Sequence, residues 1–168
     1  MTVQDMIDQV RARTGESFSR VRACQIINDA LLRLSSLYET AAKRRQLNYT
    51  AERDGHEFMI DCIGILRVEH DGKQVTNFRA MNGYIQFPAP GTYQVTCLVA
   101  PPEVAALTDA PEIHSAYHPC IVMYLAAHAA APEDKALQAD FLAYADAVNR
   151  RLSNMRLRGL RLPARMWR

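Results

Sequence analysis

The chain has 168 residues, of which 49% are hydrophobic and 23% charged, and this is enough for one compact domain with a real core. Such a composition excludes a chain that is disordered throughout. The sequence has no apolar run of the roughly 18 to 20 residues that span a bilayer, and its first residues lack the pattern of a signal peptide. We therefore expect a soluble cytosolic protein with no membrane partner.

Charge is divided unevenly along the chain. All eighteen acidic residues lie at or before Asp146, together with thirteen of the twenty Lys and Arg residues. The other seven basic residues are arginines between Arg150 and Arg168, with no acid among them. The sequence therefore predicts an acidic body that ends in a basic C-terminal arm.

Two helices are predicted at the N-terminal end. Thr2 and Asp5 resemble a capping pair, and the apolar pattern after them stops at Thr14-Gly15. Ser19 is the expected N-cap of a longer helix that reaches Ala42, because no Gly or Pro interrupts the segment. The broad apolar stripe of this helix indicates more than one packing neighbour. The stripe comprises Val21, Cys24, Ile27, Leu31, Leu34 and Tyr38, widened by Ile26, Ala30, Leu37 and Ala41.

Alternating polar and apolar residues then predict a small antiparallel sheet. Asp54-Gly55, Asp71-Gly72 and Asn82-Gly83 are hairpin signals, because Asp and Asn tolerate positive φ and Gly adopts it without strain. The expected strands are residues 46–51, 57–61, 66–70, 74–78, 84–87 and 93–99. Two prolines after Ala100 end the sheet, because neither can donate to a ladder.

Two further helices complete the chain. Residues 119–131 are almost entirely apolar, which predicts a helix buried on most sides. Pro132-Glu133-Asp134 is a typical start for the next helix, which Gly159 and Pro163 end. The predicted fold class is α+β, a four-helix bundle core with a small antiparallel β insertion between helices 2 and 3, plus an extended C-terminal arm. We expect one helical domain, residues 1–158, with the insertion at about 46–100, and the arm at 159–168.

Signatures of catalysis are absent from the sequence. It contains no G-x-S-x-G, H-E-x-x-H, P-loop or G-x-G-x-x-G motif. Asp61, Glu69 and Asp71 would be candidates for acid and base, but solvated acids are ordinary in a hairpin region. We therefore expect no enzymatic activity.

Metal and cofactor sites are also not expected. His114 and His118 have the i, i+4 spacing of metal ligands, but no third ligand is placed nearby, and polar residues at a helix start explain them equally well. The cysteines have no C-x-x-C spacing and lie among apolar neighbours, so we expect buried, reduced thiols. They are Cys24, Cys62, Cys97 and Cys120.

The C-terminal arm is the segment whose composition requires a partner. Its arginines alternate with apolar residues, and Trp167 near a terminus is typical of an interface anchor. Guanidinium groups bind either carboxylates or nucleic-acid phosphates. A solvated tail is the alternative interpretation, and we expect residues 150–168 to be disordered in the free protein. The candidate binding residues are Arg156, Arg158, Leu160, Arg161, Leu162, Arg165, Met166, Trp167 and Arg168.

The order of these segments resembles the head-tail connector, or adaptor and head-completion, proteins of tailed bacteriophages. Residues 26–34, IINDALLRL, are similar to that family's I-N-x-A-L-x-x-L helix. Further similar segments are ILRVEHDGKQV at 65–75, NGYIQFPAP at 82–90, APP at 100–102, YHPCIVMYLA at 117–126 and DFLAY at 140–144. Pro119 departs from the family, which more often has an acidic residue after the histidine, and the arginine-rich ending matches no part of the pattern.

The resemblance implies a structural subunit that forms a ring, commonly a dodecamer, below the phage portal. Such a ring joins the DNA-filled capsid to the tail and lines the DNA channel. The implied partners are the portal protein, neighbouring adaptor subunits, a tail-side connector or tail terminator protein, and the double-stranded DNA that passes through. The implied location is the head-tail neck of the virion, after assembly in the bacterial cytoplasm. The alternative is a nucleic-acid-binding DNA-packaging accessory protein, whose DNA affinity would fall steeply with salt.

Overall fold

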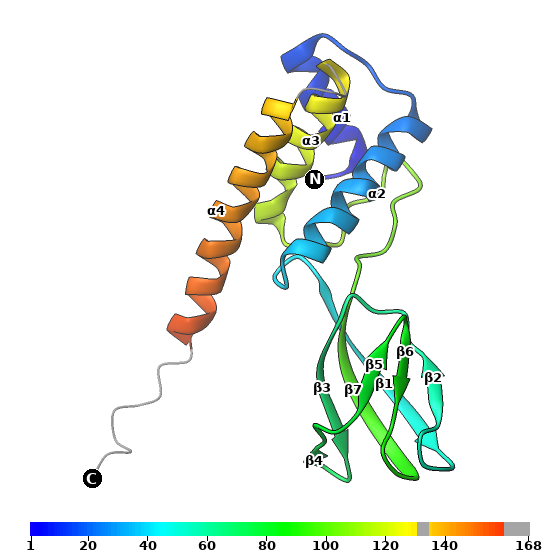
Figure 1. Ribbon diagram of the computed structural model, residues 1–168. Coiled ribbons are helices and arrows are strands. Elements are labelled where there is room, and N and C mark those ends of the chain that lie inside the picture. Colours follow the sequence, from blue (N-terminus) through cyan, green and yellow to red (C-terminus); the bar gives the residue numbers. More distant parts are fainter. Residues whose placement is uncertain (131–134, 160–168) are drawn as a thin grey trace, which may run out of the picture. The chain divides into compact units, whose positions relative to one another are not determined.

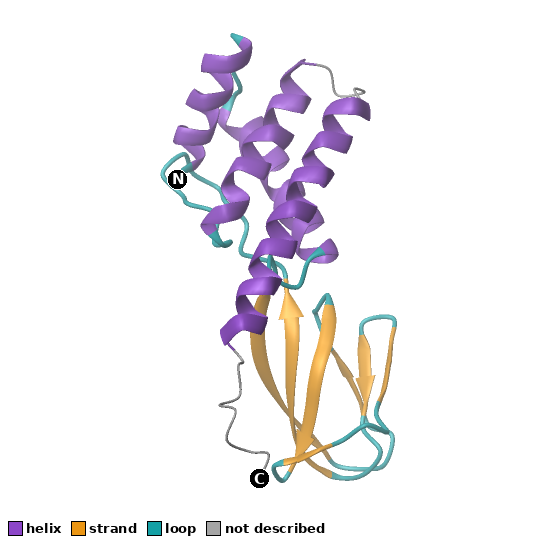
Figure 2. Cartoon of the chain, turned by 90° about the vertical axis from the view of Figure 1, so that its left-hand side faces the viewer, coloured by secondary structure: helices purple, strands orange, loops and turns teal. Residues whose placement is uncertain are grey.

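The computed structural model describes residues 1–130 and 135–159. The chain divides into two compact units (Figure 1). The helical unit consists of Met1–Ala41 and the chain from Pro102 onward, and the β unit is Ala42–Pro101. Each unit has its own cluster of buried apolar residues. Figure 2 shows helices in the first and strands in the second.

The first two helices begin at their predicted caps. Helix α1 is Val3–Thr14, and the Thr2 N–H donates to Asp5 Oδ2 at 2.8 Å while the Asp5 N–H donates to Thr2 Oγ1 at 3.2 Å. Helix α2 is Arg20–Leu37, and Ser19 Oγ accepts from a backbone N–H of its first turn at 3.4 Å. The capping pair and the second N-cap are therefore confirmed.

Helix α3, His118–Ala130, is the common neighbour of the other helices in the unit. It follows a 3-10 turn, η1 (Ser115–Tyr117), and packs against α1, α2 and α4 (Lys135–Gly159). Pro119 lies in its first turn, where a missing N–H costs no helical hydrogen bond. The prediction of a buried apolar helix is confirmed. Its buried residues include Cys120, Ile121, Val122, Tyr124, Leu125 and Ala127.

Tertiary contacts set the end of α2. The helix ends at Leu37 rather than at the predicted Ala42. Tyr38 has extended backbone, and its hydroxyl donates to Asp146 Oδ1 in α4 at 2.7 Å. Thr40 also donates to α4, at 2.8 Å. These bonds hold Tyr38 and Thr40 against α4, just beyond the end of the helix, although no Gly or Pro is present.

Helix α4 continues further than the charge pattern predicted. Val148 and Leu152 pack against the helical core, and the helix continues through Gly159, the residue predicted to end it. The expectation that residues 150–168 are disordered is therefore wrong for 150–159, because apolar contacts support the helix beyond Arg150. Residues 160–168 and the predicted helix start at 132–134 lie outside the described residues.

The β unit contains two antiparallel sheets. The four-stranded sheet has the order β1 (Lys43–Ala51), β7 (Gly91–Val99), β3 (Gly64–His70) and β4 (Lys73–Gln74). The three-stranded sheet has the order β2 (Glu57–Met59), β6 (Tyr84–Gln86) and β5 (Arg79–Met81). Aromatic rings join the sheets: the ring centroids of Tyr49 and Phe58 are 5.0 Å apart, and those of Phe87 and Tyr93 are 4.1 Å apart.

Two of the three predicted hairpin turns are confirmed. Asp71-Gly72 joins β3 to β4 and Asn82-Gly83 joins β5 to β6, with positive φ at all four residues. The third prediction is wrong. Gly55 has positive φ, but β1 pairs with β7 and β2 pairs with β6, so Asp54-Gly55 carries the chain from one sheet to the other.

The predicted architecture, a four-helix bundle core with a small β insertion, is also wrong. The structure is α+β, with four α-helices and two antiparallel sheets in the described residues. The segment between α2 and α3 forms seven strands and buries a core separate from that of the helices. The strand expected at 74–78 is wrong except at Gln74, which ends β4, because residues 75–78 form the loop that leads to β5 in the other sheet. Residue alternation identifies strands, but it does not assign them to sheets.

None of the described helices is both long enough and apolar enough to cross a membrane.

Candidate functional site

Most of the predicted portal-binding residues lie outside the part of the chain that the structure describes. These are Leu160, Arg161, Leu162, Arg165, Met166, Trp167 and Arg168. Arg156 and Arg158 belong to the last turns of α4, where the backbone is helical but the side chains are not among those described. The portal-binding site therefore stays a prediction from the sequence.

Arg151, near the start of the arginine-rich residues 150–168, borders a hollow of about 400 Å³ in the helical unit. His114, Ser115 and Ala116 line it at the start of η1, and Tyr144, Val148, Arg151 and Leu152 line it from α4. Arg150 and Arg151 are both exposed. A guanidinium next to partly exposed apolar groups is a combination common at protein interfaces.

The four cysteines are unpaired. Cys24, Cys97 and Cys120 are buried as predicted, and burial raises the pKa of each thiol, to about 11 for Cys120. The prediction of burial is wrong for Cys62, which is half-buried. Burial, and then the neighbouring Cys97, raise the pKa of its thiol. Because all four thiols are held protonated near neutral pH, they are weak nucleophiles.

His114 and His118 have structural roles at the start of α3. His114 Nδ1 accepts from the Ala116 N–H at 3.2 Å and caps η1. The pKa of His118 is lowered, mainly by burial. A hydrogen bond to the backbone of Pro111 offsets part of this effect. Within the described chain, no group of three or more His, Cys, Asp or Glu side chains is placed to hold a metal ion.

The three carboxylates considered as an acid and base pair are not gathered around a cleft. Glu69 forms an ion pair with Arg67 at 2.7 Å, and Asp71 lies 3.5 Å from His70 at the β3–β4 turn. Asp61 is exposed on the segment between β2 and β3. Asp61 and Asp71 are exposed, whereas Glu69 is half-buried beside Arg67.

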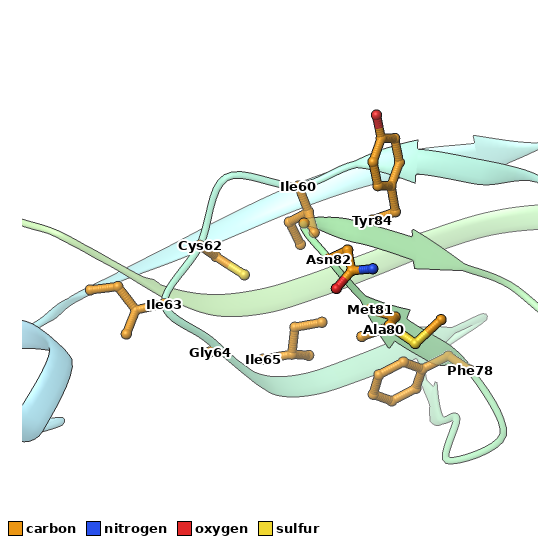
Figure 3. Close-up of a pocket in the computed structure, with 11 residues that line it drawn as sticks. Ile60, Cys62, Ile63, Gly64, Ile65, Phe78, Ala80, Met81, Asn82 and Tyr84 are labelled. Carbon is orange, nitrogen blue, oxygen red and sulfur yellow. The ribbon is translucent and has the colours of Figure 1, made fainter.

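The β unit has an apolar cleft of about 370 Å³. Figure 3 shows Ile63 and Ile65 along one side and Phe78 and Met81 along the other, with the Cys62 thiol between the strands. No charged side chain lines this cleft.

The outer face of the three-stranded sheet carries an exposed apolar row. Met59, Tyr84 and Met81 are direct cross-strand partners, so their side chains lie on the same face. Their exposed fractions are 76%, 49% and 75%. Ile85, which alternates with them, is fully buried on the inner face. Large apolar groups this exposed in one row mark a contact surface.

Sequence reasoning missed this row because it placed a strand at 74–78 instead of 79–81. The Asn82-Gly83 turn contained the missing signal. A two-residue hairpin loop makes the flanking residues direct partners, which assigns Met81 opposite Tyr84. The pairing of Met59 with Tyr84 joins strands distant in sequence, and no local pattern specifies it.

Comparison with known proteins adds no family to these observations. The chain matches no protein-family model, and no curated protein gives a significant match. The residues and their arrangement therefore carry the functional inference.

Proposed function

We propose that the protein is a structural head-tail adaptor subunit of a tailed bacteriophage. It forms a ring below the portal, joins the DNA-filled capsid to the tail and lines the DNA channel. It works by assembly and catalyses no reaction. Its proposed partners are the portal, sister subunits, a tail-side connector or terminator protein, and the DNA in the channel.

The observation that carries this proposal is the order of elements along the chain. The segments that resemble the adaptor family fall on α2, on the β3–β4 hairpin, on the Asn82-Gly83 turn with β6, on the loop after β7, on α3 and on α4. Where the resemblance implies a helix the chain has α2, α3 or α4, and where it implies a strand, an Asp-Gly turn and a strand the chain has β3 and β4. A helical unit interrupted by a β unit is an arrangement that offers separate surfaces to different neighbours.

The exposed side chains support assembly rather than catalysis. Val21, Leu32 and Leu37 of α2 are more than half exposed, and the β unit exposes Met59 and Met81. Within the described residues no charged side chain lines the apolar cleft of the β unit, and no group of three or more His, Cys, Asp or Glu side chains is placed to hold a metal ion. Apolar groups left in water on both units are stabilised when partner surfaces cover them.

The basic arm is the proposed portal contact. Residues 102–146 contain seven acids and a single basic residue, Lys135, whereas the chain after Asp146 has arginines and no acid. Carboxylates on a portal would accept bidentate bonds from the guanidinium groups, and the apolar residues between them would fill pockets.

Inactivation of the gene in the phage tests this function. An adaptor predicts lysates with separate heads and tails, because DNA is packaged but the neck is not sealed. Electron microscopy of particles and nuclease sensitivity of the packaged DNA measure both effects. Heads that never fill with DNA would instead favour the packaging accessory.

DNA binding by the purified protein separates the same two functions. A packaging accessory predicts an affinity that falls steeply between low and physiological salt, because phosphate contacts release counterions. The adaptor predicts little DNA affinity for the free subunit.

A further inference from the structure

The outer face of the three-stranded sheet has two rows of side chains. The first is the apolar row of Met59, Tyr84 and Met81. The second is Glu57, Gln86 and Arg79, again in direct register across β2, β6 and β5. A hollow of about 480 Å³ lies on this face, lined by Glu57, Arg79, Met81, Asn82, Tyr84 and Gln86.

The two charges of the second row do not pair within their own copy. Glu57 and Arg79 occupy the two outer strands with Gln86 between them, which separates their backbones by about 10 Å. Both are exposed, and neither side chain has a partner among the described residues. Gln86 is held in place, because its amide nitrogen donates to the Gly55 carbonyl at 2.9 Å.

We infer that this face binds a second copy of the same chain through a twofold axis parallel to β6. Such an axis places β2 of one copy over β5 of the other. Glu57 then faces Arg79 of the second copy, and Arg79 faces the second Glu57. Met59 faces the second Met81 in the same way, and Tyr84 lies against its own equivalent on the axis.

Charge complementarity selects the second copy as the occupant. The acidic and basic ends of the row exchange places under a half turn, so the face is complementary to itself. Under the same half turn, the apolar row of one copy faces the apolar row of the other. Methionine side chains adapt to an irregular partner surface, which suits a contact centred on two of them.

The size of the face limits the strength of the contact. Six side chains on strands of three residues cover far less than the roughly 800 Å² per partner of a stable interface. We expect a dissociation constant on the order of 100 µM. This inference goes beyond the adaptor function, because a twofold contact joins two copies and does not propagate around a ring.

Sedimentation velocity over a concentration series measures the association, with four matched proteins. Glu57→Arg places two arginines opposite two arginines, and Arg79→Glu places glutamates opposite glutamates, so each variant should associate at least about tenfold more weakly than the wild type. Glu52→Arg makes the same charge change at an exposed loop residue outside the face and should leave the association unchanged. Thermal unfolding shows that each variant is folded.

The decisive sample is an equal mixture of Glu57→Arg and Arg79→Glu. Each variant supplies the charges that the other lacks, so the mixture should associate about as strongly as the wild type although neither component does alone. A wild-type protein that stays monomeric up to about 1 mM overturns the inference. An association that both reversals leave intact, or that the mixture does not restore, overturns it as well, since the copies would then meet through another surface.

Discussion

The hydroxyl of Tyr38 donates a hydrogen bond to the carboxylate of Asp146 at 2.7 Å, which joins the end of α2 to α4. Burial is the main reason that the pKa of Tyr38 is raised to about 12, and the hydrogen bond to Asp146 adds to it. Asp146 is also the last acid before the basic segment. The bond therefore fastens α4 just ahead of the residues proposed to reach the portal.

Removal of this hydroxyl should loosen α4. Tyr38→Phe keeps the ring and deletes the donor, so we expect a loss of about 1.5 kcal/mol in the unfolding free energy. Hydrogen exchange should quicken in the part of α4 after Asp146. Tyr144→Phe, which changes a half-exposed tyrosine on the same helix, is the control. Equal exchange rates in both variants would mean that apolar packing alone holds this part of α4.

The helical core should not tolerate a charge. Leu125 of α3 is fully buried, so Leu125→Asp should destabilise the helical unit by several kcal/mol, because an unpaired carboxylate is left in an apolar site. Leu32→Asp, at a position on α2 that is 55% exposed, should cost less than about 0.5 kcal/mol. Urea unfolding followed by circular dichroism measures both. Similar midpoints would show that Leu125 is not in the core.

Gly91 at the start of β7 should resist any side chain. Its φ is 144°, and an added Cβ would collide with the ring of His70. We expect Gly91→Ala to destabilise the β unit by about 2 kcal/mol or more, as strain and the collision add. Urea unfolding followed by near-ultraviolet circular dichroism of the aromatic rings measures this loss.

Two variants separate the collision from the strain. His70→Ala combined with Gly91→Ala should recover part of the loss, measured against His70→Ala alone. Gly72→Ala, at a positive φ with open space around the added Cβ, should cost only about 1 kcal/mol. If Gly91→Ala lowers the unfolding free energy no more than Gly72→Ala does, the ring of His70 moves aside easily.

His118 should make the helical unit sensitive to acid. Burial lowers its pKa in the folded state, so the unfolded chain binds the proton more readily. Its contribution to stability is present above the unfolded pKa of about 6.5 and is lost as pH falls through the lower folded value. His118→Gln should therefore lose less stability between neutral pH and about pH 5 than the wild type does.

The matched control for this pH dependence is His128→Gln, a substitution near the end of the same helix. The slope of urea midpoint against pH in this variant gives the effect of removing a histidine elsewhere on the helix. A slope unchanged by His118→Gln would assign the acid sensitivity to other groups.

Local signals in this sequence identify local structure. Thr2 with Asp5, Ser19 and the Asp71-Gly72 turn were readable because each acts on backbone groups within four residues. The position at which α2 ends could not be predicted from the sequence. The hydrogen bond made there by Tyr38 goes to Asp146, which lies 108 residues further along the chain.

Strand pairing was equally hidden from the sequence. The register of Met59 with Tyr84 depends on how two sheets pack around a core, not on either segment alone. The exposed face therefore emerges only from the structure. For the basic arm, by contrast, the sequence is the source of information. Its arginine-rich composition is clear from the sequence, and its residues from 160 onward lie outside the described chain.

The arm should be needed for docking but not for folding. Deletion of residues 160–168 should leave thermal unfolding nearly unchanged while it abolishes binding to the portal, because the apolar and basic contacts are lost together. Trp167→Ala should weaken that binding by about 2 kcal/mol, and Trp167→Phe, which keeps an aromatic ring, by less. Titration of the portal by calorimetry measures each. Full binding by the truncated protein would place the portal contact elsewhere on the chain.

Electron microscopy of the portal of the same phage, with and without this protein, tests the adaptor function most directly. We expect an added ring of density below the portal, with one symmetric set of subunits around the channel. The same sample made with the protein lacking residues 160–168 should show the portal alone. A portal that remains bare in the presence of folded, full-length protein would contradict the proposed adaptor function.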